Sequence, residues 1–196
     1  MNATTGSTPA PAPDTATGWL ATARHCPSPN CDARPLETLV DLLVIHCISL
    51  PPGEFGGTWI EQLFLNQLDP AQHPYFRAIA NLRVSAHLLI RRNGELVQYV
   101  DLHQRAWHAG VSTFNGRTDC NDFSIGIELE GTDNSPFTDA QYERLIPTTQ
   151  AIRRLFPAIT PERILGHQHI APGRKTDPGS GFNWERYLGS LYARRW

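Results

Sequence analysis

The sequence predicts an α/β fold in which strands and helices share one domain. Three features support this class: an almost continuous apolar run at residues 39–50, two alternating segments on either side of Asn93-Gly94, and a Thr-x-x-Gln pattern at residues 138–141. They are typical of a buried strand, a β-hairpin and a helix start, respectively. With 196 residues, 40% of them hydrophobic, the chain is long enough to bury one full core.

Charge and composition exclude several classes of protein. A net charge of −2 offers no basic surface for nucleic acid. No segment approaches the ~20 apolar residues that cross a bilayer. The first residues, MNATTG, have neither the basic segment nor the apolar run of a secretory signal. We therefore expect a cytoplasmic protein that binds neither nucleic acid nor membrane, and we expect a monomer.

The chain divides into a tail and a folded part. Residues 1–17 are rich in Ala, Thr and Pro and predict a disordered N-terminal tail, which leaves residues 18–196 as the domain. The four cysteines form no Cys-x-x-Cys pair and no disulfide framework, so we expect thiols. They are Cys26, Cys31, Cys47 and Cys120.

The first predicted strand, residues 39–50, carries a histidine. By the two-residue period of a strand, His46 shares a face with Val44 and Ile48. A histidine on an apolar strand is usually a hydrogen-bonded core residue, and the strand alone favours that interpretation. A short helix is predicted next, at residues 58–65.

The hairpin comprises residues 84–91 and 95–100, which alternate in hydrophobicity around the Asn-Gly turn. After it, Trp107 stands beside His108. Such a pair suits the wall of a site for a sugar or peptide, and core packing explains it equally well.

Residues 123–130 predict another strand, with two carboxylates on one face. Glu128 and Glu130 lie opposite Ile125, Ile127 and Leu129. A carboxylate in an apolar strand costs free energy unless it is paired or catalytic. A structural ion pair would explain one of these two carboxylates. We interpret Glu128 as the functional candidate. Beyond this strand, the pattern predicts a helix to about residue 156, a strand at 163–170 and an amphipathic helix at 183–195.

Residues 166–179, GHQHIAPGRKTDPG, hold the densest set of chemical groups. A carboxylate at Asp177 can return to the same metal as His167, and Lys175 would then lie beside that metal. Two His and a carboxylate are sound ligands for a catalytic zinc. His-x-His pairs also occur as ordinary residues, and spacing alone does not select which histidines bind.

Five stretches together resemble a known family. They are 44–57 (VIHCISLPPGEFGG), 84–87 (VSAH), 105–112 (RAWHAGVS), 121–133 (NDFSIGIELEGTD) and 166–178 (GHQHIAPGRKTDP). From Trp19 to Tyr187 the chain resembles the cytoplasmic anhydro-N-acetylmuramoyl-L-alanine amidases of the AmpD type. This resemblance implies the fold of amidases and peptidoglycan-recognition proteins, a mixed central β-sheet flanked by helices.

The resemblance also implies a site and a reaction. One zinc ion would be held by His46, His167 and Asp177, with Glu128 as general base and Lys175 holding the oxyanion. The bond cleaved would be the amide between the lactyl group of anhydro-N-acetylmuramic acid and L-Ala, in soluble muropeptides released during cell-wall recycling. The structural interpretation of His46 is thereby reversed.

Three residues are candidates for binding this substrate: Arg83 for a stem-peptide carboxylate, Trp107 as an apolar wall and His108 as a hydrogen-bond donor. Three positions depart from the family pattern. They are Cys47 in place of Asn, Asp119 where some relatives carry Arg, and His169 in place of Asp or Asn. We read His169 as a neighbour of the site, not a ligand.

Two alternatives remain beside this reading. One is an amidase that acts on the intact wall, which the absence of a signal segment disfavours. The other is a peptidoglycan-binding module without activity, which the filled ligand and catalytic positions disfavour.

Overall fold

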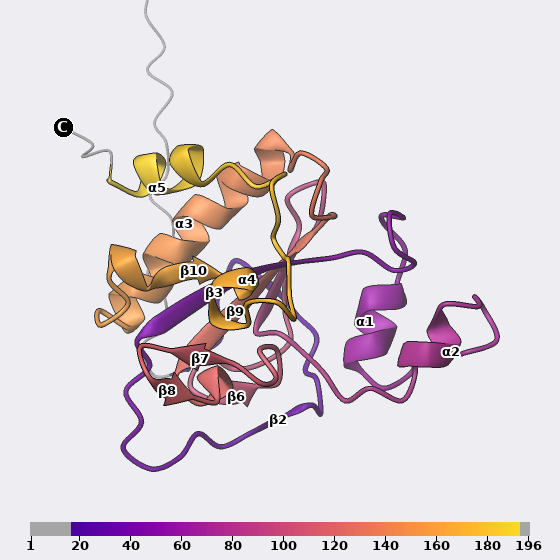
Figure 1. Ribbon diagram of the computed structural model, residues 1–196, viewed down its shortest axis with the longest axis horizontal. Helices are drawn as coiled ribbons and strands as arrows, with labels where there is room; N and C mark the ends of the chain where they lie inside the picture. Colours follow the sequence, from indigo (N-terminus) through magenta and orange to yellow (C-terminus); the bar gives the residue numbers. More distant parts are fainter. Residues whose placement is uncertain (1–16, 193–196) are drawn as a thin grey trace, which may run out of the picture.

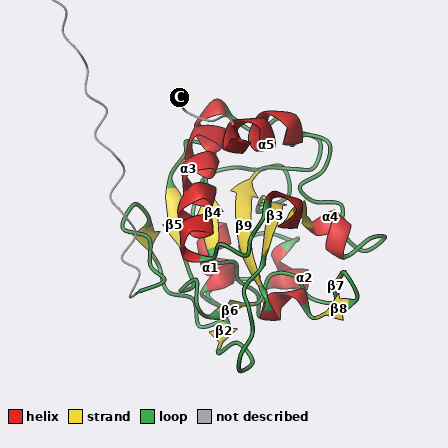
Figure 2. Cartoon of the chain, turned by 90° about the vertical axis from the view of Figure 1, so that its left-hand side faces the viewer, coloured by secondary structure: helices red, strands yellow, loops and turns green. Residues whose placement is uncertain are grey.

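The computed structural model describes residues 17–192, and a mixed six-stranded sheet lies at its centre (Figures 1 and 2). The strands follow the order β1-β5-β4-β9-β3-β10, and only the β4–β5 pair is antiparallel. In chain order they are β1 Arg24–His25, β3 Leu42–Ile48, β4 Leu88–Ile90, β5 Leu96–Gln98, β9 Ser124–Glu130 and β10 Ile164–Gly166. The predicted fold class is confirmed.

Helices and short ribbons surround this sheet. The helices are α1 Trp59–Phe64, α2 Phe76–Ile79, α3 Asp139–Leu155, α4 His167–Ile170 and α5 Trp184–Tyr192, with 3₁₀ turns η1 Cys120–Asp122 and η2 Pro161–Arg163. Two small antiparallel ribbons pair β2 Cys31–Asp32 with β6 Arg105–Ala106, and β7 Thr113–Phe114 with β8 Arg117–Thr118. None of the described helices is long and apolar enough to cross a bilayer.

The two faces of the sheet differ in the side chains that they carry: one packs into the apolar core, and the other carries polar groups. On one face, Ile45 and Ile127 are fully buried in a core that α3 and α5 complete; Figure 1 shows these two helices together above the sheet. On the other face lie His46 and Glu128, which are direct neighbours in the parallel register of β3 and β9. The alternation predicted for both strands is confirmed, and it brings the two polar side chains to the same side of the sheet.

The helix start at Thr138 is confirmed as a reciprocal capping box. The Thr138 hydroxyl accepts from the Gln141 amide at 3.2 Å, and the Gln141 side chain accepts from the Thr138 amide at 3.0 Å. Gln141 also donates to the carbonyls of Ile90 and Glu130, so the cap joins α3 to β4 and β9. Residues 1–16 of the predicted tail, and the last residues of the helix predicted at 183–195, lie outside the described range.

The antiparallel hairpin is confirmed, with Ile90 paired to Leu96. Its strands are shorter than predicted, as is β3, because apolar alternation continues beyond the last ladder hydrogen bonds. A short helix is present where residues 58–65 predict one.

Candidate active site

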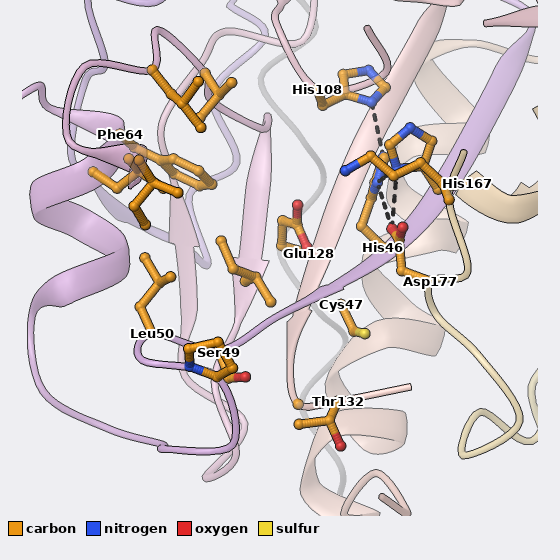
Figure 3. Close-up of a pocket in the computed structure, with 18 of the residues that line it drawn as sticks. His46, Cys47, Ser49, Leu50, Phe64, His108, Glu128, Thr132, His167 and Asp177 are labelled. Carbon is orange, nitrogen blue, oxygen red and sulfur yellow. Dashed lines mark hydrogen bonds and ion pairs between the residues drawn. The ribbon is translucent and has the colours of Figure 1, made fainter. Parts of the chain in front are cut away.

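A pocket of about 430 Å³ opens where the parallel strands β3, β9 and β10 end. One side of the pocket is polar, and its lining includes His46, Glu128, His167 and Asp177 (Figure 3). The other side, here called the apolar shelf, is lined by Leu63, Phe64, Tyr75, Ile79, Leu82 and Val84. Ligands of open α/β sheets bind in such a crevice beyond the carboxyl ends of strands.

Three side chains from distant parts of the chain converge at the polar side. The Nδ1 atoms of His46 and His167 lie 3.0 Å apart, and each lies 3.1 Å from Oδ2 of Asp177. The two histidines are buried, with 1% and 2% of their surface exposed. Among the described residues this is the cluster whose ligand atoms are close enough to hold one metal ion.

The loop that carries Asp177 folds back onto the start of α4. The backbone N–H of Gln168 donates to the Asp177 carbonyl at 2.9 Å. Gly166 permits this approach, since a Cβ there would lie 2.6 Å from the ring of Pro178. The sequence correctly predicts that the carboxylate returns to His167.

The strand predicted at residues 163–170 is wrong in its second half. β10 ends at Gly166, and His167–Ile170 form α4. In a strand, His167 and His169 would share a face. The helical turn separates them: His167 enters the cluster, whereas His169 is exposed and accepts from the Gly166 N–H at 3.0 Å.

We therefore expect His169→Asn to leave metal content and activity close to those of the unmodified protein. An Asn side-chain oxygen can accept from the same N–H, and no ligand atom of the cluster is changed. Elemental analysis and rate measurements on the purified variant check this. A metal-free His169→Asn protein would show that the wrong histidine of the pair has been assigned.

The positions of the ring protons in this cluster leave nitrogen atoms that can bind a cation. The Nε2 atom of His167 lies 2.9 Å from the Ala109 carbonyl, which only accepts, so Nε2 carries a proton and Nδ1 is the ring atom left to bind a cation. Burial lowers the pKa of His46 to about 4, which favours the neutral form of this ring. A carboxylate and histidine lone pairs thus point at one position, as metal ligands do.

Glu128 lies beside this cluster, with its carboxyl group at the pocket wall (Figure 3). Its Oε2 atom is buried and has no hydrogen-bond partner among the described residues. Burial, and then the charge of Asp177, raises the pKa of Glu128 well above its usual value, which Lys175 partly offsets. By contrast, Glu130 is already engaged: its carboxylate accepts from the N–H groups of Gly56 at 2.6 Å and Arg92 at 3.1 Å.

The remaining predicted site residues differ in position. Lys175 and Trp107 line the pocket, and the Trp107 indole N–H donates to Asp32 at 3.2 Å. His108 also lines it, but its two ring nitrogens face His46 and Ser124. Arg83 is exposed and is not part of the lining. The substrate roles of these residues stay predictions.

Two parts of the pocket were not predicted from the sequence. One is the apolar shelf, whose residues around α1 and α2 carry no recognisable motif. The other is Asp133, which accepts from Cys47 Sγ at 3.2 Å and from the Thr176 hydroxyl, and whose carbonyl accepts from Gly181 N–H at 2.7 Å. Asp133 thereby joins β3 to the loop of Lys175. Its place at the end of the ELEGTD run was the available signal.

Comparisons with known proteins agree with this geometry. The family model described as N-acetylmuramoyl-L-alanine amidase matches residues 36–180. A Citrobacter freundii protein named 1,6-anhydro-N-acetylmuramyl-L-alanine amidase AmpD is 61% identical over 170 residues, which are 87% of this chain and 90% of that protein.

Two solved structures are also similar. The crystal structure of a selenomethionine AmpD derivative superposes with a TM-score of 0.87 at 59% identity and covers 89% of this chain and 97% of its own. The Escherichia coli amidase AmiD, solved with anhydro-N-acetylmuramic acid-L-Ala-D-γ-Glu-L-Lys, has a TM-score of 0.56 at 31% identity and covers 80% of this chain and 60% of its own. The resemblance drawn from the motifs is confirmed, and the chain belongs to the N-acetylmuramoyl-L-alanine amidase family.

Proposed function

We propose that this protein hydrolyses the amide between the lactyl group of 1,6-anhydro-N-acetylmuramic acid and L-Ala in soluble muropeptides, as part of cell-wall recycling. The observation that carries the proposal is the convergence of His46, His167 and Asp177 beside the unpartnered carboxyl oxygen of Glu128. The relatives named AmpD, and the related AmiD bound to an anhydromuramyl peptide, support the substrate class.

Zinc is the metal that this donor set fits. Catalytic zinc takes three protein ligands from His, Asp, Glu or Cys and leaves one position open. Two histidine nitrogens and one carboxylate oxygen meet that description, and they lie in a pocket that substrate can enter. When bound, zinc supplies Lewis-acid chemistry: it polarises a carbonyl and lowers the pKa of a coordinated water to about 7.

The protein's own groups move the proton and hold the developing charge. Glu128 takes a proton from water and delivers it to the leaving amine of L-Ala, because this residue lines the pocket and its Oε2 atom has no hydrogen-bond partner among the described residues. The Lys175 ammonium, on the pocket rim, stabilises the oxyanion. Glu130 was the alternative base, but two backbone N–H groups already occupy its carboxylate.

Substrate is held between Trp107 and the apolar shelf. Anhydromuramic acid is a compact sugar without a free reducing hydroxyl, so an apolar wall with few donors suits it. Asp32 holds the indole N–H of Trp107, which fixes the orientation of that wall. His108 is already bonded at both ring nitrogens, so its predicted role as a donor to the sugar would require it to exchange a partner.

We expect the protein to cleave anhydro-muropeptides much faster than the same peptides on ordinary muramic acid, and faster than intact sacculi. The preference should appear in kcat/KM, since it reflects a difference in transition-state binding. Mass spectrometry of the two digests measures it. Equal rates on both sugars, or rapid release from sacculi, would favour an amidase of the intact wall; binding without cleavage would favour a peptidoglycan-binding module. A cytoplasmic location and a monomeric state remain part of this proposal.

A further inference from the structure

His108 lies between a metal ligand and a buried hydroxyl. Its Nδ1 atom is 2.9 Å from Nε2 of His46, and its Nε2 atom is 3.2 Å from Oγ of Ser124. The Ser124 hydroxyl is fully buried and lies 2.5 Å from the Cys120 carbonyl. These contacts form one chain of hydrogen bonds from the backbone at η1 to the candidate zinc site, and no step described above uses it.

The direction of every proton in this chain follows from its far end. A carbonyl only accepts, so the single hydroxyl proton of Ser124 goes to Cys120. Ser124 Oγ must then accept from His108, which places the proton of that neutral ring on Nε2 and leaves Nδ1 as a lone pair. The lone pair accepts from Nε2–H of His46, so the Nδ1 atom of His46 carries no proton and faces Asp177.

The backbone of β9 is shaped to seat this ring. A Cβ at Gly126 would lie 2.5 Å from Cγ of His108 and 2.6 Å from its Nδ1, closer than real contacts allow. A larger residue at this position would displace the imidazole from its place between Ser124 and His46.

We propose that His108 and Ser124 are positioning residues that hold His46 in the tautomer and orientation that a metal ion requires. For His167, the backbone carbonyl of Ala109 fixes the proton on Nε2 and the orientation of the ring. Among the described residues no backbone carbonyl bonds to the His46 ring, and its Nε2 atom faces the His108 side chain instead. Partners of this kind typically change metal affinity or activity by about 10–100-fold. The identity of the metal as zinc rests on the proposed function. The assignment of protons to His46, His108 and Ser124 is independent of it.

The first test reads the tautomers directly. Zinc-free protein with ¹⁵N-labelled histidine is examined by long-range ¹H–¹⁵N correlation, with His108→Asn and His46→Asn used for assignment. The expected spectrum shows the Nε2–H tautomer for both His46 and His108. An Nδ1–H tautomer or a doubly protonated ring at His108 would overturn the proposal, whether or not the protein binds zinc.

The second test measures zinc affinity by competition with a chromophoric chelator, without substrate. His108→Leu removes the acceptor and should weaken zinc binding by about 10–100-fold. His108→Asn places an amide oxygen near the former Nδ1 and should restore most of the affinity, and Ser124→Ala should cause an intermediate loss. Unchanged affinity in His108→Leu overturns the proposal. If the unmodified protein takes up no zinc, the proposed function fails and the tautomer measurement still decides this inference.

A matched control separates positioning from general destabilisation. Thr149→Val removes a fully buried hydroxyl that lies 2.7 Å from the Tyr187 hydroxyl, on the other face of the sheet. It should lower the melting temperature without changing zinc affinity. If zinc affinity falls equally in Thr149→Val and His108→Leu, the effect belongs to stability and the positioning role is rejected.

Discussion

Asp177→Ala should purify with far less metal than the unmodified protein and should lose nearly all amidase activity. Asp177 supplies the formal negative charge among the three proposed ligands, and its removal leaves two imidazoles whose Nδ1 atoms lie 3.0 Å apart. Two neutral ligands hold zinc poorly compared with the three that catalytic sites use. Elemental analysis after dialysis measures the loss. Added zinc should raise the melting temperature of the unmodified protein but not of the variant, because only a bound ligand stabilises the folded state.

Lys175→Ala is the matched control for this change. It lies two residues away on the same loop, and it removes a positive charge from the rim of the pocket. Zinc should therefore be retained, since the field around the site becomes less repulsive to a cation, while the rate falls. Full metal occupancy in Asp177→Ala, or metal loss in Lys175→Ala, would contradict the ligand assignment.

The central sheet was predictable because its strands obey simple rules of burial. β3 and β9 are apolar runs whose alternate residues face α3 and α5, so their existence and facing follow from composition and the two-residue period. The capping box at Thr138 is a local pattern and was found for the same reason. The order of the six strands depends on pairings between distant segments, such as β3 with β10, which no local pattern contains.

The site was predictable only in part. The pairing of His46 with Glu128 requires the parallel register of two strands 82 residues apart in sequence, which periodicity does not give. The choice between His167 and His169 depends on where β10 ends, and it ends because Gly166 and Gln168 bond to His169 and Asp177 instead of continuing the ladder. The family resemblance supplied the ligand set; the residues alone left it open.

Glu128→Gln should reduce kcat by about 10²–10⁴-fold, the usual contribution of a general acid–base group, which corresponds to about 3–5 kcal/mol of activation free energy. The amide has nearly the shape of the carboxylate but does not accept the proton from water. Zinc content and substrate affinity should change little, because Glu128 is not one of the three proposed ligands. Stability should not fall: in the described part of the chain the Oε2 atom has no partner to lose, and burial of a neutral amide costs less than burial of a charge.

Glu130→Gln gives the opposite pattern and makes the test specific. Glu130 lies two residues further along the same face of β9 but accepts from Gly56 and Arg92 and lies 3.6 Å from Arg91. Replacing this satisfied carboxylate should lower the free energy of unfolding by about 1–3 kcal/mol, with a much smaller effect on kcat. Stopped-flow or steady-state rates on an anhydro-muropeptide, together with denaturant unfolding, measure both variants. If Glu130→Gln loses the rate and Glu128→Gln keeps it, the general base is Glu130, and the unpartnered oxygen of Glu128 has another purpose.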